Sequence, residues 1–585
     1  MLLVQTRRSL IRAIPSLRRL QSTWIERGGF SKVKGPTSPA VVGHTTGSIL
    51  EEVCSKHGHL PAIISHHQNV TLTFSELDRL SSVVARNLAH KGGIKPGDRV
   101  AVCSGNRWEY PVLQFALGKL GAVLIPLNTA FTDKQFDSAL RHADISAILT
   151  TENIIKRDRS RDRDLSGLVA SAASIAKEKG VEQDIVYIIG NPDHPNSFEN
   201  LLDENVSSVE FDTNQDNVIN MQFTSGTTSA PKLSELTHKN VVNNGVFIGN
   251  RMGLSATQAR HPTGQDHMCI PVPMFHCFGL VLSNMAALTH GAAVVYPSES
   301  FDPEATLEAI TKYKCTGVNG VPTMFAAELE IYDPEKHNMD YLSKGIAAGS
   351  PIPVEMMHKL VDVFHLTELT ICYGMTETSP VSFMTTPQDP LEKRVATVGR
   401  VMPNTEAMIA EPGDDGLNPL PLNKAGEIVV SGYLVQRGYY RDPENSAQVM
   451  IKDASGKTWM RTGDEGVIDE EGYLTVTGRI KDLIIRGGEN IHPLEIENML
   501  FTHPSVSQAS VVGVPDEKYG EAVAAFIIPH HGETIDPQEM KDFVREHLGP
   551  FLAPEHVFTV QDFPQTASGK IRKVDLRKQA AKLLE

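Results

Sequence analysis

The sequence has few of the features on which disulfide-rich, zinc-binding and membrane proteins depend. Its 585 residues include only six cysteines, which are scattered, with no CxxC pair and no histidine cluster at zinc-binding spacing. We therefore expect reduced, buried thiols instead of a disulfide framework. The chain also lacks any uninterrupted run of about 18 apolar residues, so it predicts no membrane-spanning helix.

An excess of positive charge is lacking as well. Lys and Arg number 55 against 70 Asp and Glu, which gives a formal net charge of -15. This balance argues against nucleic acid as a partner, although a local basic pocket could still hold a nucleotide. The 41% hydrophobic and 21% charged residues are typical of a globular protein, and the length predicts two or more domains.

The first 25 residues differ from the rest of the chain. The segment MLLVQTRRSLIRAIPSLRRLQSTWI carries five arginines, interspersed Ser and Thr, and no acid before Glu26. That composition predicts a mitochondrial import segment over residues 1–25 and a matrix location. The alternative is a disordered basic tail.

The hydropathy pattern predicts an α/β protein of two domains. From Arg99 to Gly374, short apolar runs such as RVAVCSG and LTICYG alternate with helix-length amphipathic segments, which indicates parallel sheets flanked by helices. After Gly399, short strands separated by turns favour a distorted β-barrel element. We expect a large N-terminal domain over 40–480 and a small, mobile α+β domain over 481–585.

The stretch QFTSGTTSAPK, residues 222–232, has the hydroxyl-rich character of a phosphate-binding loop. A Walker loop would have a second glycine where Pro231 stands and a hydroxyl where Leu233 stands. Because proline lacks the amide that would wrap a phosphate, we expect no helix to open there in the Walker manner. The loop must bind phosphate in another way.

Four further motifs follow in order: YGMTET (373–378), RTGD ending at Asp464, GRIKDLIIRGGENIHP (478–493) and PQTASGKIRK, which includes Lys570. With them the chain resembles the acyl-adenylating superfamily of AMP-forming acyl-CoA synthetases over nearly its whole length. The segments INMQFTSGTT, GVPTMF, AAGSPIP, TVGRVMPN and IIRGGENIHPLEIE are most similar to its mitochondrial medium-chain branch, acyl-CoA synthetase family member 2.

The resemblance implies that ATP, a carboxylic acid and coenzyme A are substrates and that Mg²⁺ accompanies ATP. Since an anionic carboxylate must approach an anionic α-phosphate, positioning and charge neutralisation would supply the catalysis. The implied catalytic residues are Lys570, Thr376 and Glu377, of which Glu377 would hold the metal. The implied ATP-binding residues are Thr224, Ser225, Gly226, Thr227, Thr228, Ser229, Ala230, Pro231, Lys232, Ala348, Gly349, Ser350, Tyr373, Asp464, Arg479 and Lys570.

The same resemblance assigns roles to the small domain. Lys570 would bridge the substrate carboxylate and the α-phosphate, after which the domain would swing about Lys481. Gly487 and Gly488 would then lie beside the CoA channel, where glycine allows the thiol arm close to the backbone. His276 is implied at the mouth of the acyl pocket, although a core histidine bonded to a backbone carbonyl is an alternative.

The substrate is predicted to be a simple carboxylic acid, because no Asp or Glu that could pair with an amino group occurs between Pro271 and His290. Only 15 residues follow Lys570, too few for a carrier domain, so free CoA is the expected acceptor. Our first hypothesis is an ATP-dependent, AMP-forming fatty acid–CoA ligase for medium-chain acids. Ser229 and Leu233 replace glycines usual in the family's loop, so a catalytically silent nucleotide- or acyl-binding relative is the alternative.

Overall fold

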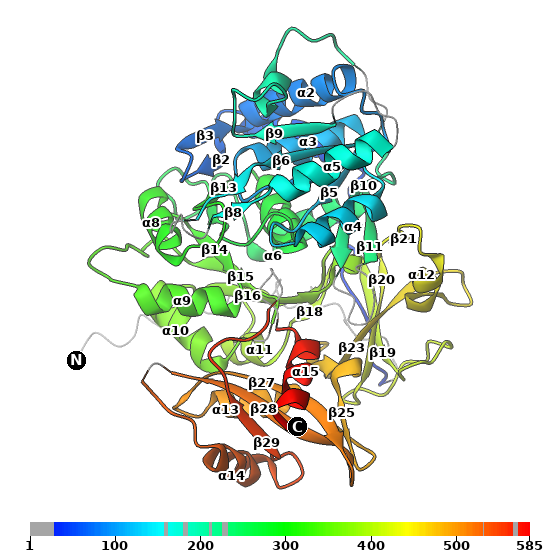
Figure 1. Cartoon of the computed structure of the whole chain (residues 1–585), viewed down its shortest axis with the longest axis vertical. Coiled ribbons are helices and arrows are strands. Elements are labelled where there is room, and N and C mark those ends of the chain that lie inside the picture. The colour runs from blue at the N-terminus through cyan, green and yellow to red at the C-terminus, as the bar shows by residue number, and fades with distance from the viewer. Residues whose placement is uncertain are drawn as a thin grey trace, which may run out of the picture.

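The protein folds into a large unit of three main sheets and a smaller C-terminal unit (Figure 1). The large unit also contains a two-stranded sheet of β7 (Asn153–Ile154) and β8 (Arg163–Asp164). The structure is a computed structural model that describes residues 29–156, 162–178, 185–209, 213–224, 232–350, 352–530, 532–565 and 571–584. The import segment expected over 1–25 lies outside these residues. Mixed α/β architecture is confirmed, and within the described residues no helix is long and apolar enough to cross a membrane.

The first sheet has seven strands, and its central strands are parallel and buried on both faces. Their order is β9 (Val186–Ile189), β6 (Ala147–Thr151), β4 (Arg99–Cys103), β5 (Val123–Pro126), β10 (Val218–Thr224), β11 (Lys232–Thr237) and β21 (Gly438–Tyr439). The last three strands run antiparallel to one another.

The second sheet has nine strands and a parallel centre flanked by antiparallel strands. Their order is β3 (Val70–Thr73), β2 (Pro61–Ser65), β13 (Ala293–Tyr296), β12 (His267–Cys269), β14 (Gly317–Gly320), β15 (Lys344–Ala347), β16 (Glu368–Gly374), β17 (Val381–Met384) and β18 (Arg400–Val401).

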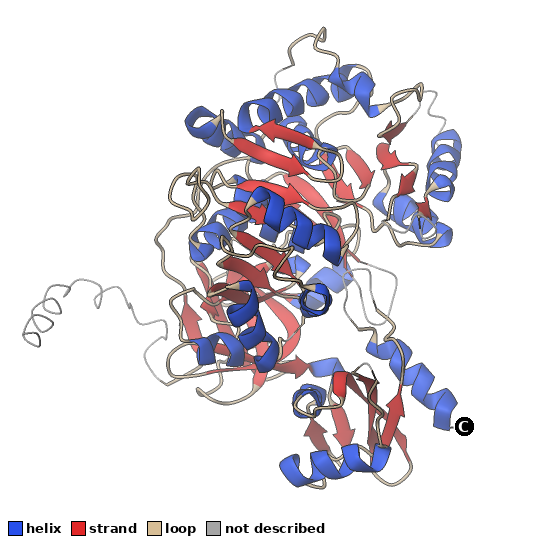
Figure 2. Ribbon diagram, turned by 90° about the vertical axis from the view of Figure 1, so that its left-hand side faces the viewer, coloured by secondary structure: helices blue, strands red, loops and turns tan. Residues whose placement is uncertain are grey.

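Helices cover these sheets, as Figure 2 shows. They are α1 (Thr46–His57), α2 (Phe74–His90), α3 (Glu109–Leu120), α4 (Asp133–Ala143), α5 (Ser166–Glu178), α6 (His238–Met252), η4 (Phe278–Met285) with α7 (Ala286–Leu288), α8 (Pro303–Tyr313), α9 (Pro322–Ile331), α10 (Val354–Phe364), α11 (Leu391–Ala396) and α12 (Pro443–Val449). Thr73, Thr132 and Thr237 start α2, α4 and α6 through capping boxes, which satisfy amides left free at a helix end.

The third sheet is antiparallel and corresponds to the expected barrel element. It contains β1 (Lys32–Lys34), β19 (Thr405–Ala410), β20 (Gly426–Gly432), β23 (Thr458–Ile468), β22 (Met450–Lys452) and β24 (Leu474–Arg479). Since β1 pairs with β19, the large unit includes residues before position 40, where the sequence indicated its start.

The C-terminal unit has a core of its own. Its sheet contains β26 (Glu489–Ile491), β25 (Ile484–Arg486), β28 (Gly520–Pro529), β27 (Val506–Asp516) and β29 (His556–Thr559). Val511 packs with α13 (Pro493–Phe501) and α14 (Pro537–Leu548) on one face, and Val512 packs with α15 (Lys573–Leu584) on the other. A short 3₁₀ turn, η6 (Ile480–Asp482), connects the two units.

Candidate active site

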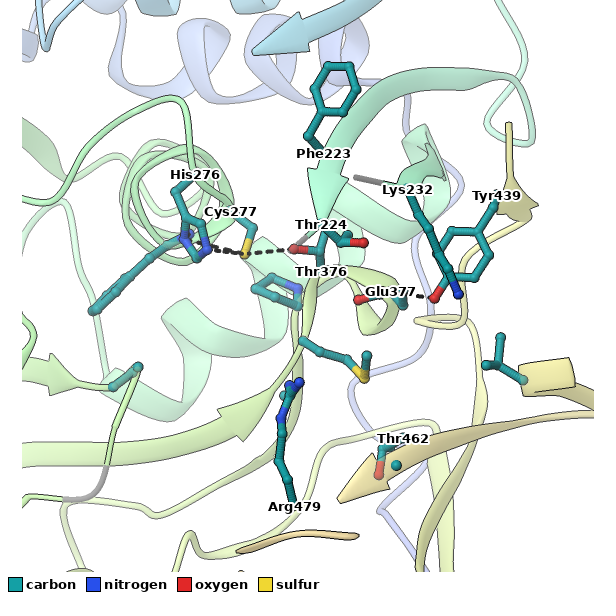
Figure 3. Close-up of a pocket in the computed structure, with 18 of the residues that line it drawn as sticks. Phe223, Thr224, Lys232, His276, Cys277, Thr376, Glu377, Tyr439, Thr462 and Arg479 are labelled. Carbon is teal, nitrogen blue, oxygen red and sulfur yellow. Dashed lines mark hydrogen bonds between the residues drawn. The ribbon is translucent and has the colours of Figure 1, made fainter. Parts of the chain in front are cut away.

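One cavity of about 900 Å³ lies where β10, β16, the third sheet and the C-terminal unit meet. Ligands in open α/β sheets bind at the carboxyl ends of strands, and both β10 and β16 end at this cavity. The C-terminal unit contributes Gln565 and Arg572 to the lining. The cavity therefore joins residues that are far apart in the sequence (Figure 3).

The end of β16 brings Thr376 and Glu377 into the cavity. Both lie in the 3₁₀ turn η5 (Thr376–Thr378), and both are buried. The hydroxyl of Tyr439 donates a 2.9 Å hydrogen bond to Oε1 of Glu377. Burial raises the pKa of Glu377, an effect that the bond from Tyr439 and the charge of Arg479 oppose.

Asp464 connects β16 to the third sheet. Its Oδ2 accepts a 2.8 Å hydrogen bond from the hydroxyl of Tyr373, and its Oδ1 lies 3.1 Å from Nε of Arg479. The pairing of β23 with β24 sets Asp464 opposite Arg479. The carboxylate of Asp464 raises the pKa of Arg479. The pKa of Tyr373 is also raised, mainly by burial and to a smaller extent by the negative charge of Asp464. Arg479 lines the cavity, as do Thr462 and Gly463 just before Asp464.

The hydroxyl-rich stretch is framed by two paired strands. Thr224 ends β10 and Lys232 begins β11 directly opposite it, and both line the cavity. A strand thus follows the loop, which confirms that no Walker-type helix opens there. Leu233 pairs with Phe223 and is fully buried, so a strand accommodates it without glycine's backbone freedom. The loop residues Ser225, Gly226, Thr227, Thr228, Ser229, Ala230 and Pro231 lie outside the described residues.

An apolar region adjoins the polar one. Phe275, Phe278 and Leu282 line the cavity beside His276 and Cys277. Nδ1 of His276 accepts a hydrogen bond of 3.1 Å from the amide of Phe278, which leaves Nε2 to carry the proton of the neutral ring. Sγ of Cys277 lies 3.7 Å from Oγ1 of Thr376, so the apolar region begins next to the buried hydroxyl (Figure 3).

The other predicted residues divide into two groups. Ala348, Gly349 and Lys481 line the cavity, whereas Ser350 does not. Gly487 and Gly488 are also absent from the lining: they form the two-residue turn between β25 and β26, with φ of 60° and 90°. Lys570 lies outside the described residues, but Gln565 and Arg572 on either side of its segment line the cavity.

Sequence reasoning assigned no role to Tyr439, Thr462, Gln565 or Arg572, although Thr462 lies in RTGD and the last two lie in PQTASGKIRK. Tyr439 stands in the stretch QRGYYRDP, where no spacing or composition distinguishes it from its neighbour Tyr440. Its importance arises only when β21 pairs with β11 and carries its side chain to Glu377.

The site fits a metal that arrives with the nucleotide. Among the described residues, no cluster of three His, Cys, Asp or Glu side chains could hold an ion. Mg²⁺ is commonly bound by one or two carboxylates together with substrate phosphates. Glu377 offers such a carboxylate in the cavity wall, so the donor set suits Mg²⁺ shared with phosphate oxygens.

Comparison with known families agrees with this geometry. The model of the AMP-binding enzyme family matches residues 50–440, and that of the AMP-binding enzyme C-terminal domain matches residues 495–570. The chain belongs to the AMP-binding enzyme family. It is thus an enzyme of the group that includes the AMP-forming acyl-CoA synthetases, as the sequence motifs predict.

Individual relatives of this AMP-binding enzyme extend over nearly its whole length. The Acyl-CoA ligase sidI of Aspergillus fumigatus is 39% identical over 574 residues, covering 95% of this chain and 94% of its own. The mitochondrial Medium-chain acyl-CoA ligase ACSF2 of Danio rerio is 35% identical, covering 95% and 91%. The crystal structure of ATP-bound MatB from Rhodopseudomonas palustris superposes with a TM-score of 0.79 at 26% identity, covering 93% of this chain and 100% of that chain.

Proposed function

We propose that this enzyme joins a fatty acid to coenzyme A in two steps, through an acyl-adenylate. In the first step a carboxylate oxygen of the acid attacks the α-phosphorus of ATP and pyrophosphate leaves. In the second step the CoA thiol attacks the acyl carbon and AMP leaves. The observation that carries this proposal is the single cavity in which Thr376, Glu377 and Arg479 adjoin the apolar wall of Phe275, Phe278 and Leu282.

The polar residues suit the parts of a nucleotide. Asp464 can accept hydrogen bonds from ribose hydroxyls with its two oxygens, and the aromatic ring of Tyr373 is suited to stacking on adenine. The hydroxyl of Thr376 can donate to an α-phosphate oxygen. Lys232, with Thr224 and the loop between them, supplies positive charge and hydroxyl donors for the outgoing phosphates.

Glu377 is the residue we assign to hold Mg²⁺. When bound, the ion neutralises phosphate charge and so favours approach of the anionic acid. Glu377 can serve this role only as a carboxylate, and the bond from Tyr439 favours that charged form.

We assign the charge that bridges acid and α-phosphate to Lys570. This assignment comes from the motif PQTASGKIRK, and the cavity contacts of Gln565 and Arg572 support it. For the thioester step we propose that the C-terminal unit turns about Lys481 within η6 and brings Gly487 and Gly488 to the CoA channel. Their absence from the cavity lining in this structure supports such alternation.

We propose a medium-chain fatty acid as the substrate and mitochondria as the site of action. The segment Pro271–His290, which contains the apolar wall, carries no Asp or Glu to bind an amino group. The relative from Danio rerio is named a mitochondrial medium-chain ligase, and the arginine-rich segment 1–25 has the composition of an import sequence.

A two-stage assay tests the proposal. Purified protein is incubated with ATP, Mg²⁺ and saturated acids from C4 to C16, first without CoA to measure pyrophosphate release and then with CoA to measure thioester. We expect both products, with a maximum at medium chain length. ATP binding without either product across the panel would favour a silent relative, and pyrophosphate without thioester would indicate another acceptor.

A further inference from the structure

Tyr439 contacts two oppositely charged residues of the cavity at once. Its hydroxyl donates to Oε1 of Glu377 at 2.9 Å, and the ammonium nitrogen of Lys232 lies 4.9 Å from the centroid of its ring. Figure 3 shows the three side chains together at one wall of the cavity. The hydroxyl of this one residue therefore contacts the anion, and its ring face contacts the cation.

The backbone fixes Tyr439 relative to both partners. In β21 it pairs with Ser234 of β11, two residues beyond Lys232. Its amide donates to Oγ of Ser446 at 2.9 Å, and the amide of Gln436 donates to the carbonyl of Glu377 at 2.9 Å. The side chain is 7% exposed, so it has little freedom to leave this position.

The arrangement keeps a cation and an anion near each other without pairing them. Among the residues that the structure describes, no ion pair joins Lys232 to Glu377. A direct pair would neutralise both groups, and incoming phosphates and metal would have to break it. Contacts through the ring and the hydroxyl instead leave both charges available to the cavity.

We propose that Tyr439 is a positioning residue for adenylation, which holds Lys232 and Glu377 apart and directed toward the phosphates and the metal that ATP brings. The inference rests on the roles given to those two residues under the proposed function. Tyr439 acts through them and does not itself touch the reacting atoms.

Two variants separate its two contacts. Tyr439→Phe keeps the ring beneath Lys232 and removes the bond to Glu377, whereas Tyr439→Leu removes both. Tyr440→Phe is the matched control, because Tyr440 directly follows β21 in the chain, lies outside the cavity lining, and has a ring that contacts Arg99 and Arg441. Calorimetry measures binding of α,β-methylene-ATP to the full-length protein with and without Mg²⁺, alongside kcat and KM for pyrophosphate release.

Without Mg²⁺, we expect Tyr439→Phe to bind the analogue as tightly as the wild type does. With Mg²⁺, we expect the variant to bind the analogue roughly tenfold more weakly than the wild type, since hydrogen bonds to charged groups are of that strength. Tyr439→Leu should also bind about fivefold more weakly without Mg²⁺, because the contact between ammonium and ring is lost. Tyr440→Phe should match the wild type in both conditions.

Unchanged binding of Tyr439→Phe in both conditions, or equal loss in both, overturns the proposal. The Phe variant decides the matter even if thermal melting shows that the Leu variant does not fold. Because the analogue needs no acid, binding tests Tyr439 separately from the substrate: a wild type that binds Mg²⁺ and analogue but activates no acid refutes the proposed function alone.

Discussion

The hydroxyl of Tyr373 donates a 2.8 Å hydrogen bond to Oδ2 of Asp464, 91 residues further along the chain. This bond joins β16 of the second sheet to β23 of the third sheet, next to Gly374 and Gly463, which line the cavity. The other carboxylate oxygen of Asp464 is held by Arg479. Aromatic ring, carboxylate and guanidinium are thus placed relative to one another before any nucleotide binds, which lowers the ordering cost of binding.

Removal of that hydroxyl should weaken ATP binding without abolishing catalysis. Tyr373→Phe retains the ring but leaves only Arg479 to orient the carboxylate of Asp464, so we expect KM for ATP to rise roughly tenfold with little change in kcat. Tyr473→Phe is the matched control, because Tyr473 makes an equivalent 2.7 Å bond to Asp389 away from the cavity lining. An equal rise in KM in the control would show that the effect is structural.

The pH dependence of adenylation should reflect Glu377. Burial raises the pKa of this carboxyl above its ordinary range, and Tyr439, Arg479 and Thr224 act against the rise. Since the metal-binding role proposed for Glu377 needs its carboxylate, pyrophosphate release should decline as pH falls through that pKa. Tyr439→Phe removes one of the opposing bonds, so its decline should begin at a higher pH.

A series of pyrophosphate assays from pH 5 to 9 at saturating Mg²⁺ checks this prediction. Glu377→Gln should be nearly inactive at every pH, because the amide cannot replace the carboxylate. A decline at the same pH in wild type and Tyr439→Phe would mean that another group controls the acid limb.

Glu328 should make the protein less stable as pH rises. It is fully buried on α9 with neither side-chain oxygen hydrogen-bonded, and burial raises its pKa to about 8. Between the unfolded value near 4.5 and this folded value, the folded state keeps a proton that the unfolded state loses. The free energy of unfolding should therefore fall by about 1.4 kcal/mol per pH unit across this window.

Urea unfolding at pH 5.5, 6.5 and 7.5 measures the slope. Glu328→Gln should remove it, whatever the variant's absolute stability, whereas Glu330→Gln, an exposed change two residues further on, should retain it. If the slopes of the wild type and Glu328→Gln coincide, the carboxyl is not the source.

The sequence predicted most of the fold because its apolar runs are unambiguous. RVAVCSG contains β4 and LTICYG lies in β16, as the pattern predicts. Strand β14 could not be predicted in this way, because its residues, GVNG, include two glycines and an asparagine and form no apolar run. The early start of the large unit was missed because β1 has only three residues, two of them lysines, and is defined by its pairing with β19.

The candidate site was predictable where motifs mark it and not where topology creates it. Thr376, Glu377 and Arg479 belong to recognisable motifs and do meet in the cavity. Tyr439 carries no such signal, because it reaches the cavity only when β21 pairs with β11. Arg572 lies within the motif PQTASGKIRK, but the motif gave it no role, and it reaches the cavity only through docking of the C-terminal unit.

Lys570→Ala should separate the two half-reactions. If this lysine neutralises charge between the acid and the α-phosphate, its loss should slow pyrophosphate release by about 100-fold or more, as removal of a preorganised donor does elsewhere. Thioester formation from supplied octanoyl-AMP and CoA should change little, since in the proposed mechanism that step uses the other orientation of the C-terminal unit. Lys578→Ala, an exposed lysine on α15, controls for the loss of a positive charge. Equal loss in both half-reactions would contradict alternation, and an unchanged first step would remove Lys570 from the catalytic set.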